Sequence, residues 1–411
     1  MSIDPAATAG ISPSEAAAKP NSYAMLALAM LAAMFDGFDG QSIGFLAPAI
    51  GKDWGLPKAE FGAIFSIGLV GLIIGAVVVA PLGDRFGRRA VAIGGTLIVA
   101  MFTLLTAAAT TPTQLALLRM MTGIGLGTLM PILVTIAHEV APPRASGAFV
   151  TLLVTAFPFG SFLGGILTAW GLQHLGWRDI YLASGLIACL FPPLFWAFLR
   201  PAPVPPQARD DSGRKPTVVS LFRGRWWLPT GLLWTLFFAS LLNTYMLGAW
   251  MPVLFERGGM TTAEAVRVTA GYGLGGTIGG IALGFAAERF GGAILAVAYA
   301  VAAVGLFAIG MSTGAVSVLM VLVALVGAMI PGGHVGNNVL AARIYPPVMN
   351  ATGVGWAQGL GRVGCVVGPA AVGAAVGAGA SNGSIFLGSA IVALLGAAAA
   401  VGLAFYGRRA A

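Results

Sequence analysis

Charged residues are scarce in this chain of 411 residues: Asp, Glu, Lys and Arg make up 9% of it, against 58% hydrophobic residues. A water-soluble domain carries about 25% charged residues, so the composition excludes one. Cysteine and histidine are also rare, with two and three copies. Because both cysteines lie in apolar runs and the histidines lie far apart, we expect no disulfide framework, metal site or cofactor.

Long apolar stretches fill most of the chain instead. Each has about 20 residues or more, long enough for a tilted helix to cross about 30 Å of hydrocarbon. They cover residues 24–50, 58–81, 90–109, 114–140, 147–173, 178–199, 228–255, 264–286, 292–312, 315–342, 352–378 and 384–406. The sequence therefore predicts an all-α membrane protein with twelve transmembrane helices.

The net charge of +8 is explained by the distribution of the basic residues. With the N-terminus placed in the cytoplasm, 15 of the 22 Lys and Arg residues lie in cytoplasmic segments and five lie in outer loops. This asymmetry is the positive-inside rule. It predicts a multi-pass membrane protein with both termini cytoplasmic, and it requires no nucleic acid partner.

One long polar stretch divides the chain in two. Residues 200–227 are Pro-rich and then charged, which is typical of a linker, here cytoplasmic. We expect a disordered cytoplasmic tail at residues 1–22, six-helix bundles at 23–199 and 228–406, and a short cytoplasmic tail at 407–411.

The two halves resemble each other at a constant offset of 204 residues. The matching positions are Gly44 and Pro48 with Gly248 and Pro252, Asp84–Gly87 with Glu288–Gly291, Pro142-Pro143 with Pro346-Pro347, and Gly160 and Gly164 with Gly364 and Gly368. A duplicated six-helix unit whose halves run parallel is the architecture of rocker-type secondary transporters.

Asp36 and Asp39 lie midway along the first apolar stretch. A spacing of three places both carboxylates on one helix face, where each charge costs about 2.5–3.5 kcal/mol. Low dielectric and a like-charged neighbour favour one shared proton near neutral pH, so we expect the pair to couple transport to protons. The alternative is a structural pair satisfied by donors from partner helices.

Two arginines also fall inside apolar stretches. Arg362 is flanked by glycines, and its planar fork suits a carboxylate, so we expect it to bind an anionic substrate. Alternatively, it neutralises Asp36 and Asp39. Arg119 either assists proton movement or forms a structural ion pair with one of these acids.

A polar cluster follows Pro331-Gly332-Gly333 in the tenth stretch. His334, Asn337 and Asn338 are predicted to line a cavity beside a helix break, although His334 could equally be a satisfied interior donor. The seventh stretch could add further substrate-binding side chains. These are Asn243, Tyr245 and Trp250, of which Trp250 could instead belong to an interfacial aromatic belt.

Charges at helix ends suggest gating elements. The loop at Gly83–Arg89 is predicted to be a latch between helix ends rather than a substrate contact. Its charged residues are Asp84, Arg85, Arg88 and Arg89, and its copy in the second half contains Arg289. Glu139 and Arg343 are equivalent at the 204-residue offset and carry opposite charges. They could form a cytoplasmic gate pair, or they could simply be exposed helix-end charges.

These motifs resemble those of a known family. Gly83–Arg89 resembles the loop between helices two and three of the major facilitator superfamily, and Asp36-Gly37-Phe38-Asp39 is similar to the DGxD motif of its aromatic acid:proton symporters. Residues 119–131, 157–177 and 345–369 are also similar to that family. The resemblance implies proton-driven import of a small aromatic carboxylate such as a hydroxybenzoate. It also implies functional charges at Asp36, Asp39, Arg119, Glu139 and Arg362. We expect a monomer in the lipid bilayer of a bacterial-type inner membrane.

Two rival functions are compatible with the same fold. One is a proton-coupled exporter of drugs or metabolites, and the other is a receptor that senses its ligand without moving it. An ATP-driven pump is disfavoured because the chain contains no GxxxxGK[ST] motif. An enzyme is disfavoured because these motifs supply no set of nucleophile, base and orienting group.

Overall fold

The computed structural model describes residues 22–141, 146–199, 218–312 and 316–410. Twelve helices in these ranges are long and apolar enough to cross a membrane, which confirms the predicted number. Most of the predicted tail (1–22) and linker (200–227) lies outside the described residues. Two differences are visible at the edges. Short helices occupy part of the predicted linker, and the last helix extends past residue 406 to Ala410.

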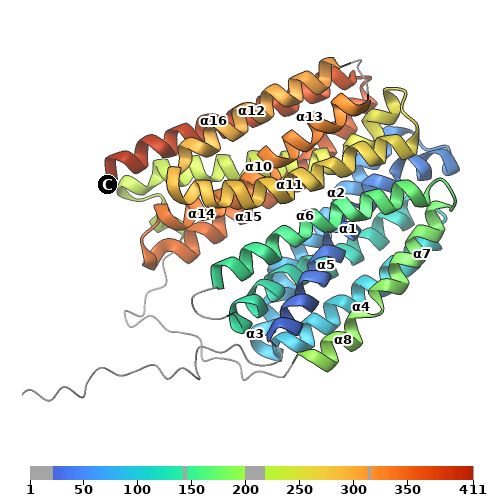
Figure 1. Cartoon of the computed structure of the whole chain (residues 1–411), viewed down its shortest axis with the longest axis horizontal. Coiled ribbons are helices and arrows are strands. Elements are labelled where there is room, and N and C mark those ends of the chain that lie inside the picture. Colours follow the sequence, from blue (N-terminus) through green and yellow to red (C-terminus); the bar gives the residue numbers. More distant parts are fainter. Residues whose placement is uncertain (1–21, 142–145, 200–217, 313–315, 411) are drawn as a thin grey trace, which may run out of the picture.

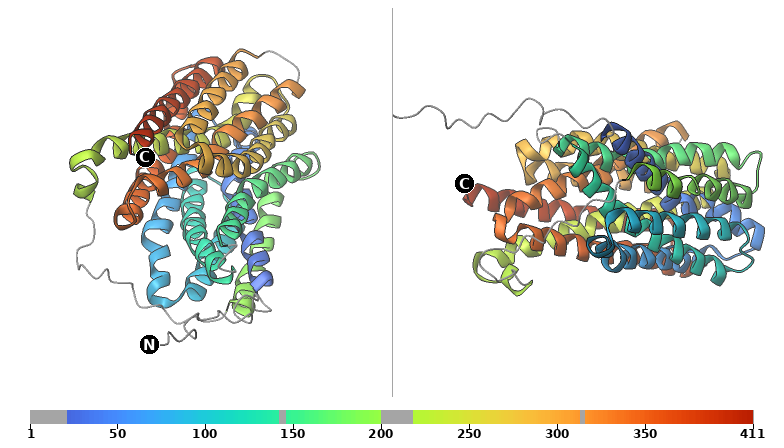
Figure 2. Two further views of the ribbon diagram at one scale, coloured as in Figure 1. Left: turned by 60° about the vertical axis from the view of Figure 1, so that its left-hand side comes forward. Right: turned by 90° about the horizontal axis from the view of Figure 1, so that it is seen from below.

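The elements of the first bundle are α1 (Ser22–Trp54), η2 (Lys58–Glu60), α2 (Phe61–Ile74), η3 (Gly75–Val79), η4 (Ala80–Leu82), α3 (Gly83–Phe86), α4 (Arg88–Ala107), α5 (Pro112–Val140), α6 (Ser146–Gly171), α7 (Trp177–Ala188) and α8 (Phe191–Phe198). The second spanning helix is thus built from several segments, and α7 and α8 together make the sixth. The two bundles stand side by side with their long axes roughly parallel (Figures 1 and 2).

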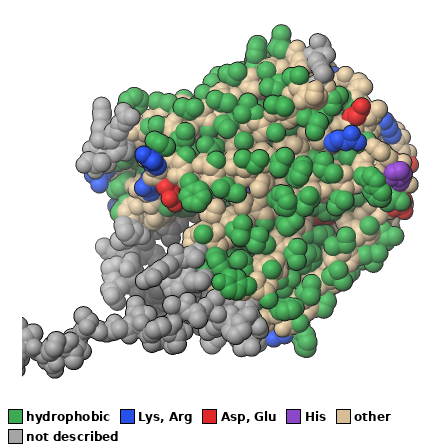
Figure 3. Space-filling model, in the orientation of Figure 1, with side chains coloured by type: hydrophobic (Ala, Val, Ile, Leu, Met, Phe, Trp, Pro, Cys, Tyr) green, Lys and Arg blue, Asp and Glu red, His purple; other side chains and the backbone are tan. Residues whose placement is uncertain are grey.

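The elements of the second bundle are α9 (Val218–Leu221), η5 (Gly224–Trp226), α10 (Trp227–Arg257), α11 (Thr262–Phe290), α12 (Gly292–Met311), α13 (Val316–Met329), α14 (Pro331–Ile344), α15 (Pro347–Gly377) and α16 (Asn382–Ala410). Pro331 separates α13 from α14, as the break predicted in the tenth stretch requires. Large apolar side chains cover the visible face, and charged side chains gather near its ends (Figure 3), as lipid contact demands.

The packing of the helices reproduces the 204-residue repeat. A Cβ on Gly71 would lie 2.0 Å from the carbonyl oxygen of Met120, and a Cβ on the equivalent Gly275 would lie 1.9 Å from that of Ala324. Glycine therefore brings α2 onto α5 in the first bundle and α11 onto α13 in the second, at matching positions. The two bundles are copies of one packing scheme as well as of one sequence pattern.

The bundles are joined most closely at one end. One cluster of buried apolar side chains runs from the first bundle into the second, from Ile50 and Phe61 to Trp250 and Phe255. A separate cluster, which includes Leu26 and Ile136, lies within the first bundle only. Backbones also approach across the interface, since a Cβ on Gly44 would lie 2.8 Å from the Cα of Ala249. The closed end is the one predicted to face outward.

Candidate functional site

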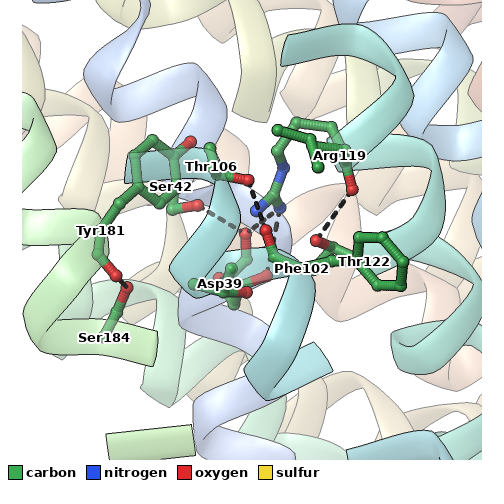
Figure 4. Close-up of polar contacts among 10 residues, drawn as sticks. Asp39, Ser42, Phe102, Thr106, Arg119, Thr122, Tyr181 and Ser184 are labelled. Atoms are coloured by element: carbon green, nitrogen blue, oxygen red, sulfur yellow. Dashed lines mark hydrogen bonds and ion pairs between the residues drawn. The ribbon is translucent and has the colours of Figure 1, made fainter. Parts of the chain in front are cut away.

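Asp39 forms a buried ion pair with Arg119, between α1 and α5 (Figure 4). The Arg119 Nη2 lies 3.1 Å from Asp39 Oδ2 and donates to the Asp39 carbonyl oxygen at 2.8 Å. The Thr103 hydroxyl donates to Oδ1 at 3.3 Å, and the guanidinium lies over the Tyr181 ring. Of the two partners predicted for Arg119, the structure selects Asp39.

Asp36 has a different environment from Asp39, one turn away. Its side chain is 2% exposed, it lines a cavity, and it makes no hydrogen bond or ion pair with the described residues. It interacts electrostatically with Asp39. The two carboxylates therefore differ in what they can bind. Asp39 is paired with a counter-ion, whereas Asp36 can take up a proton or contact a ligand.

The cavity lies between the two bundles and has a volume of about 40 Å³. A water molecule needs at least about 10–15 Å³, so this space holds a few waters and no aromatic ring. Its wall is mostly apolar. The lining side chains include Asp36, Gln41 and Ile43 of α1, Ile64 and Phe65 of α2, Arg119 of α5, Phe157 of α6, and Tyr245 and Ala249 of α10.

Tyr245 connects this cavity to polar groups deeper in the second bundle. It interacts electrostatically with Asp36 of the first bundle and with Arg362 of the second. Arg362 in turn interacts electrostatically with His334, whose Nδ1 lies 3.4 Å from the Ser240 hydroxyl oxygen. The Arg362 Nη1 is buried and has no hydrogen-bond partner among the described residues. An unpaired buried guanidinium nitrogen is costly, and an anionic ligand would remove that cost.

The other predicted substrate-binding side chains contact neighbouring helices instead. Asn243 donates to the Ser389 carbonyl at 3.2 Å, and Asn337 donates to the Tyr299 hydroxyl at 2.8 Å. Asn338 accepts from Gln358 at 2.9 Å. Trp250 is completely buried and donates to the Pro369 carbonyl, so the alternative of an interfacial belt is wrong. Of the predicted substrate-binding residues, Tyr245 alone lines the cavity.

Most of the residues that line the cavity were not singled out by the sequence analysis, among them Gln41, Phe65 and Phe157. Gln41 carried a usable signal, because an amide in an apolar stretch five residues after Asp36 is unusual. The two phenylalanines carried none, since many others fill the same apolar stretches.

Two of the predicted gating residues, Arg343 and Arg89, contact other helices of their own bundles. Arg343 of α14 donates to the carbonyls of Ala287 and Glu288 and so caps the end of α11. The Glu139 side chain lies outside the described residues, so its pairing with Arg343 stays a prediction. Arg89 donates to the Trp196 carbonyl of α8 and lies over its ring. The remaining charges of these loops are the exposed Asp84, Arg85 and Arg289 and the partly buried Arg88.

A salt-bridge clamp joins the bundles at their closed end. Glu256 of α10 lies 3.2 Å from Lys52 Nζ and 2.7 Å from Lys58 Nζ, both in the first bundle. Its side chain is 9% exposed, against 65% and 38% for the two lysines. The sequence analysis used these lysines only to set topology. Their positions show that they also hold the two bundles together.

We expect Glu256→Gln to loosen this end. Exposed ion pairs contribute about 0.2–1 kcal/mol each and Glu256 makes two of them, so opening should become about 2- to 30-fold more frequent. The measurement is the rate at which a membrane-impermeant thiol reagent labels Ile43→Cys from outside, in a background without Cys189 and Cys365. The control is Asp53→Asn, which breaks the contacts of Asp53 with Trp177 and Arg178 inside the first bundle. Equal labelling of the two variants would contradict a clamp between bundles.

A solved structure of similar fold is the bacterial homologue of the human lysosomal transporter Spinster, in an inward-facing and unoccupied conformation. It matches with a TM-score of 0.73 and 16% sequence identity, over 95% of this chain and 98% of that one. The likeness confirms the fold, with twelve transmembrane helices in two six-helix bundles.

Sequence comparisons lead to the same family. The model described as Major Facilitator Superfamily matches residues 29–326. A gallate transporter of Pseudomonas putida is 35% identical, and a 4-hydroxybenzoate transporter of the same species is 31% identical, each over 84% of both chains. A 3-(3-hydroxy-phenyl)propionate transporter of Escherichia coli is 31% identical, also over 84% of both chains. These matches agree with the resemblance to aromatic acid:proton symporters. The chain therefore belongs to the Major Facilitator Superfamily and is a membrane transporter rather than an enzyme.

Proposed function

We propose that this transporter imports a small aromatic carboxylate together with protons by alternating access. The observation that carries the proposal is a pair of charged groups without hydrogen-bond partners among the described residues: the Asp36 carboxyl of the first bundle and the Arg362 Nη1 of the second. Both interact electrostatically with Tyr245. A substrate anion and a proton would satisfy both groups at once. The names of the relatives, which include gallate and 4-hydroxybenzoate transporters, support an aromatic acid.

The site suits the two ends of such a substrate. The apolar side chains Ile43, Ile64, Phe65 and Phe157 offer a surface for a ring. Arg362 offers a planar fork that bonds a carboxylate through two nitrogens, and His334 lies within its electrostatic reach. Because the cavity of about 40 Å³ is too small for a ring, substrate entry requires the bundles to move apart.

The proton side of the mechanism uses α1 and α5. A carboxyl group buried without a counter-ion is more stable in its neutral form, and Asp36 is in that position. Asp39 shares its charge with Arg119, so a proton on Asp39 would free Arg119. Protonation thus neutralises the site and lets the loaded carrier turn inward. A membrane potential supplies about 2.3 kcal/mol per charge per 100 mV.

The moving bodies in this scheme are the bundles at residues 23–199 and 228–406, in a monomer. We place the protein in a bacterial inner membrane with both termini cytoplasmic, because basic residues are concentrated in the segments on that side. The clamp at Glu256 then closes the outer end.

The experiment that tests this function is uptake of radiolabelled 4-hydroxybenzoate by cells that express the chain, with and without a protonophore. We expect accumulation above the vector control and its collapse when the proton gradient is removed. Uptake that is indifferent to the protonophore would contradict proton coupling. Faster loss of preloaded substrate from expressing cells, driven by the gradient, would indicate an exporter.

A further inference from the structure

We propose that Gln41 is a specificity-determining residue that reads a hydroxyl group on the ring of the substrate. The inference rests on the function proposed above and deepens it, because it separates hydroxylated aromatic acids from unsubstituted ones. It starts from the side chain itself, which is 8% exposed and lines the cavity. Its amide makes no hydrogen bond to any described residue.

The amide is unusual on this wall. Apart from Tyr245, the other lining side chains are apolar or charged. A glutamine amide carries two donor hydrogens and an acceptor oxygen. A phenolic hydroxyl donates one hydrogen bond and accepts others, so the two groups complement each other. The edge of an unsubstituted ring offers the amide no hydrogen-bond donor or acceptor of comparable strength.

Gln41 of α1 contacts α10 at a different level from Arg362. Its amide packs on Gly248, where a Cβ would lie 2.6 Å from the Gln41 Oε1. Arg362 is at a different level, because its neighbour Gly361 packs on Leu241, where a Cβ would lie 2.7 Å from the Leu241 Cδ1. Seven residues of helix separate Leu241 from Gly248, which is about 10 Å.

That separation suits a molecule with a polar group at each end. When Arg362 holds the carboxylate, the ring lies along Tyr245 and its far substituent points toward Gln41. The glycine at 248 is part of this arrangement, because any side chain there would displace the amide. The site therefore has one charged end for the acid and one neutral polar end for the hydroxyl.

The test is equilibrium binding of radiolabelled 4-hydroxybenzoate and benzoate to the purified full-length protein in lipid nanodiscs. Gln41→Leu keeps a similar volume and removes the hydrogen bond, which is worth about 0.5–1.5 kcal/mol. We expect it to weaken 4-hydroxybenzoate binding about 3- to 10-fold and to leave benzoate binding within about twofold. The control is Gln358→Leu, since Gln358 bonds Asn338 away from the cavity, and it should leave the ratio of the two affinities unchanged.

The outcomes separate this inference from the proposed function. If the unmodified protein binds both acids and Gln41→Leu weakens them equally, or weakens neither, the function stands and the role of Gln41 is overturned. If the unmodified protein binds neither acid, both proposals are overturned. Retained benzoate binding by Gln41→Leu also shows that the variant is folded.

Discussion

Arg362→Ala is expected to lower the affinity for an aromatic carboxylate by about 30-fold or more, because losing one partner of a buried charge pair costs about 2–5 kcal/mol. The effect is large because Arg119, the other arginine inside an apolar stretch, is already engaged by Asp39. Arg362→Lys should recover only part of the affinity, since an ammonium group lacks the planar fork. Binding to purified protein measures this directly.

A matched control and a second variant make the result decisive. Arg267→Ala removes an exposed arginine of α11 and should leave affinity unchanged. If Arg362 instead served to neutralise the intramembrane acids, Asp36→Asn would restore folding and activity to Arg362→Ala. Rescue of that kind would contradict a substrate-binding role, and so would unaltered affinity in Arg362→Ala.

Asp36→Asn is expected to abolish accumulation against a gradient while sparing exchange of substrate across the membrane. The neutral amide imitates a permanently protonated carboxyl group, so the carrier can still turn but cannot couple to protons. In an exchange assay with substrate on both sides, the rate should stay within about threefold of the unmodified protein, while net accumulation falls to the vector level. Persistent accumulation that a protonophore abolishes would contradict coupling through Asp36.

Asp39→Asn should behave differently, and this contrast tests the division between the two acids. It leaves the buried Arg119 without its counter-ion, and breaking a buried pair costs about 3–5 kcal/mol. We therefore expect Asp39→Asn to lower the unfolding temperature of the protein and Asp36→Asn to leave it unchanged. Thr103→Val, which removes only the 3.3 Å hydrogen bond to Asp39, is the control.

Much of the fold could be predicted from the sequence because lipid imposes simple rules. The lengths of the apolar stretches predicted the number of spanning helices, Pro331 predicted one helix break, and the 204-residue offset predicted two similar bundles. The separation of α7 from α8 at Cys189 and Leu190 and the irregular turns at Gly75–Leu82 were not predicted. They depend on how neighbouring helices pack, which a single segment does not encode.

The site was harder to predict because it depends on helix rotation. Residues three apart share a face but differ by about 60° in direction, which is enough to turn Asp39 toward α5 and Asp36 toward the cavity. The same uncertainty explains Asn243, Asn337 and Trp250, whose polar groups suggested a binding site but face α16, Tyr299 and α15. Polar type alone does not say which helix a side chain faces.

The contact of Gly44 with the backbone of Gly248 has a mechanical consequence. The two glycines are equivalent in the repeat, so their contact lies beside the axis that relates the bundles, and it is the natural fulcrum for a rocking movement. Along α10, about 14 Å of helix extends from Gly248 to Arg257, and about 32 Å extends back to Trp227. Because these two lengths are unequal, a given rotation about Gly248 moves the Trp227 end of α10 about twice as far as the clamped end. The mouth at the Trp227 end is therefore built to open wide, and the mouth at the clamped end to open narrowly.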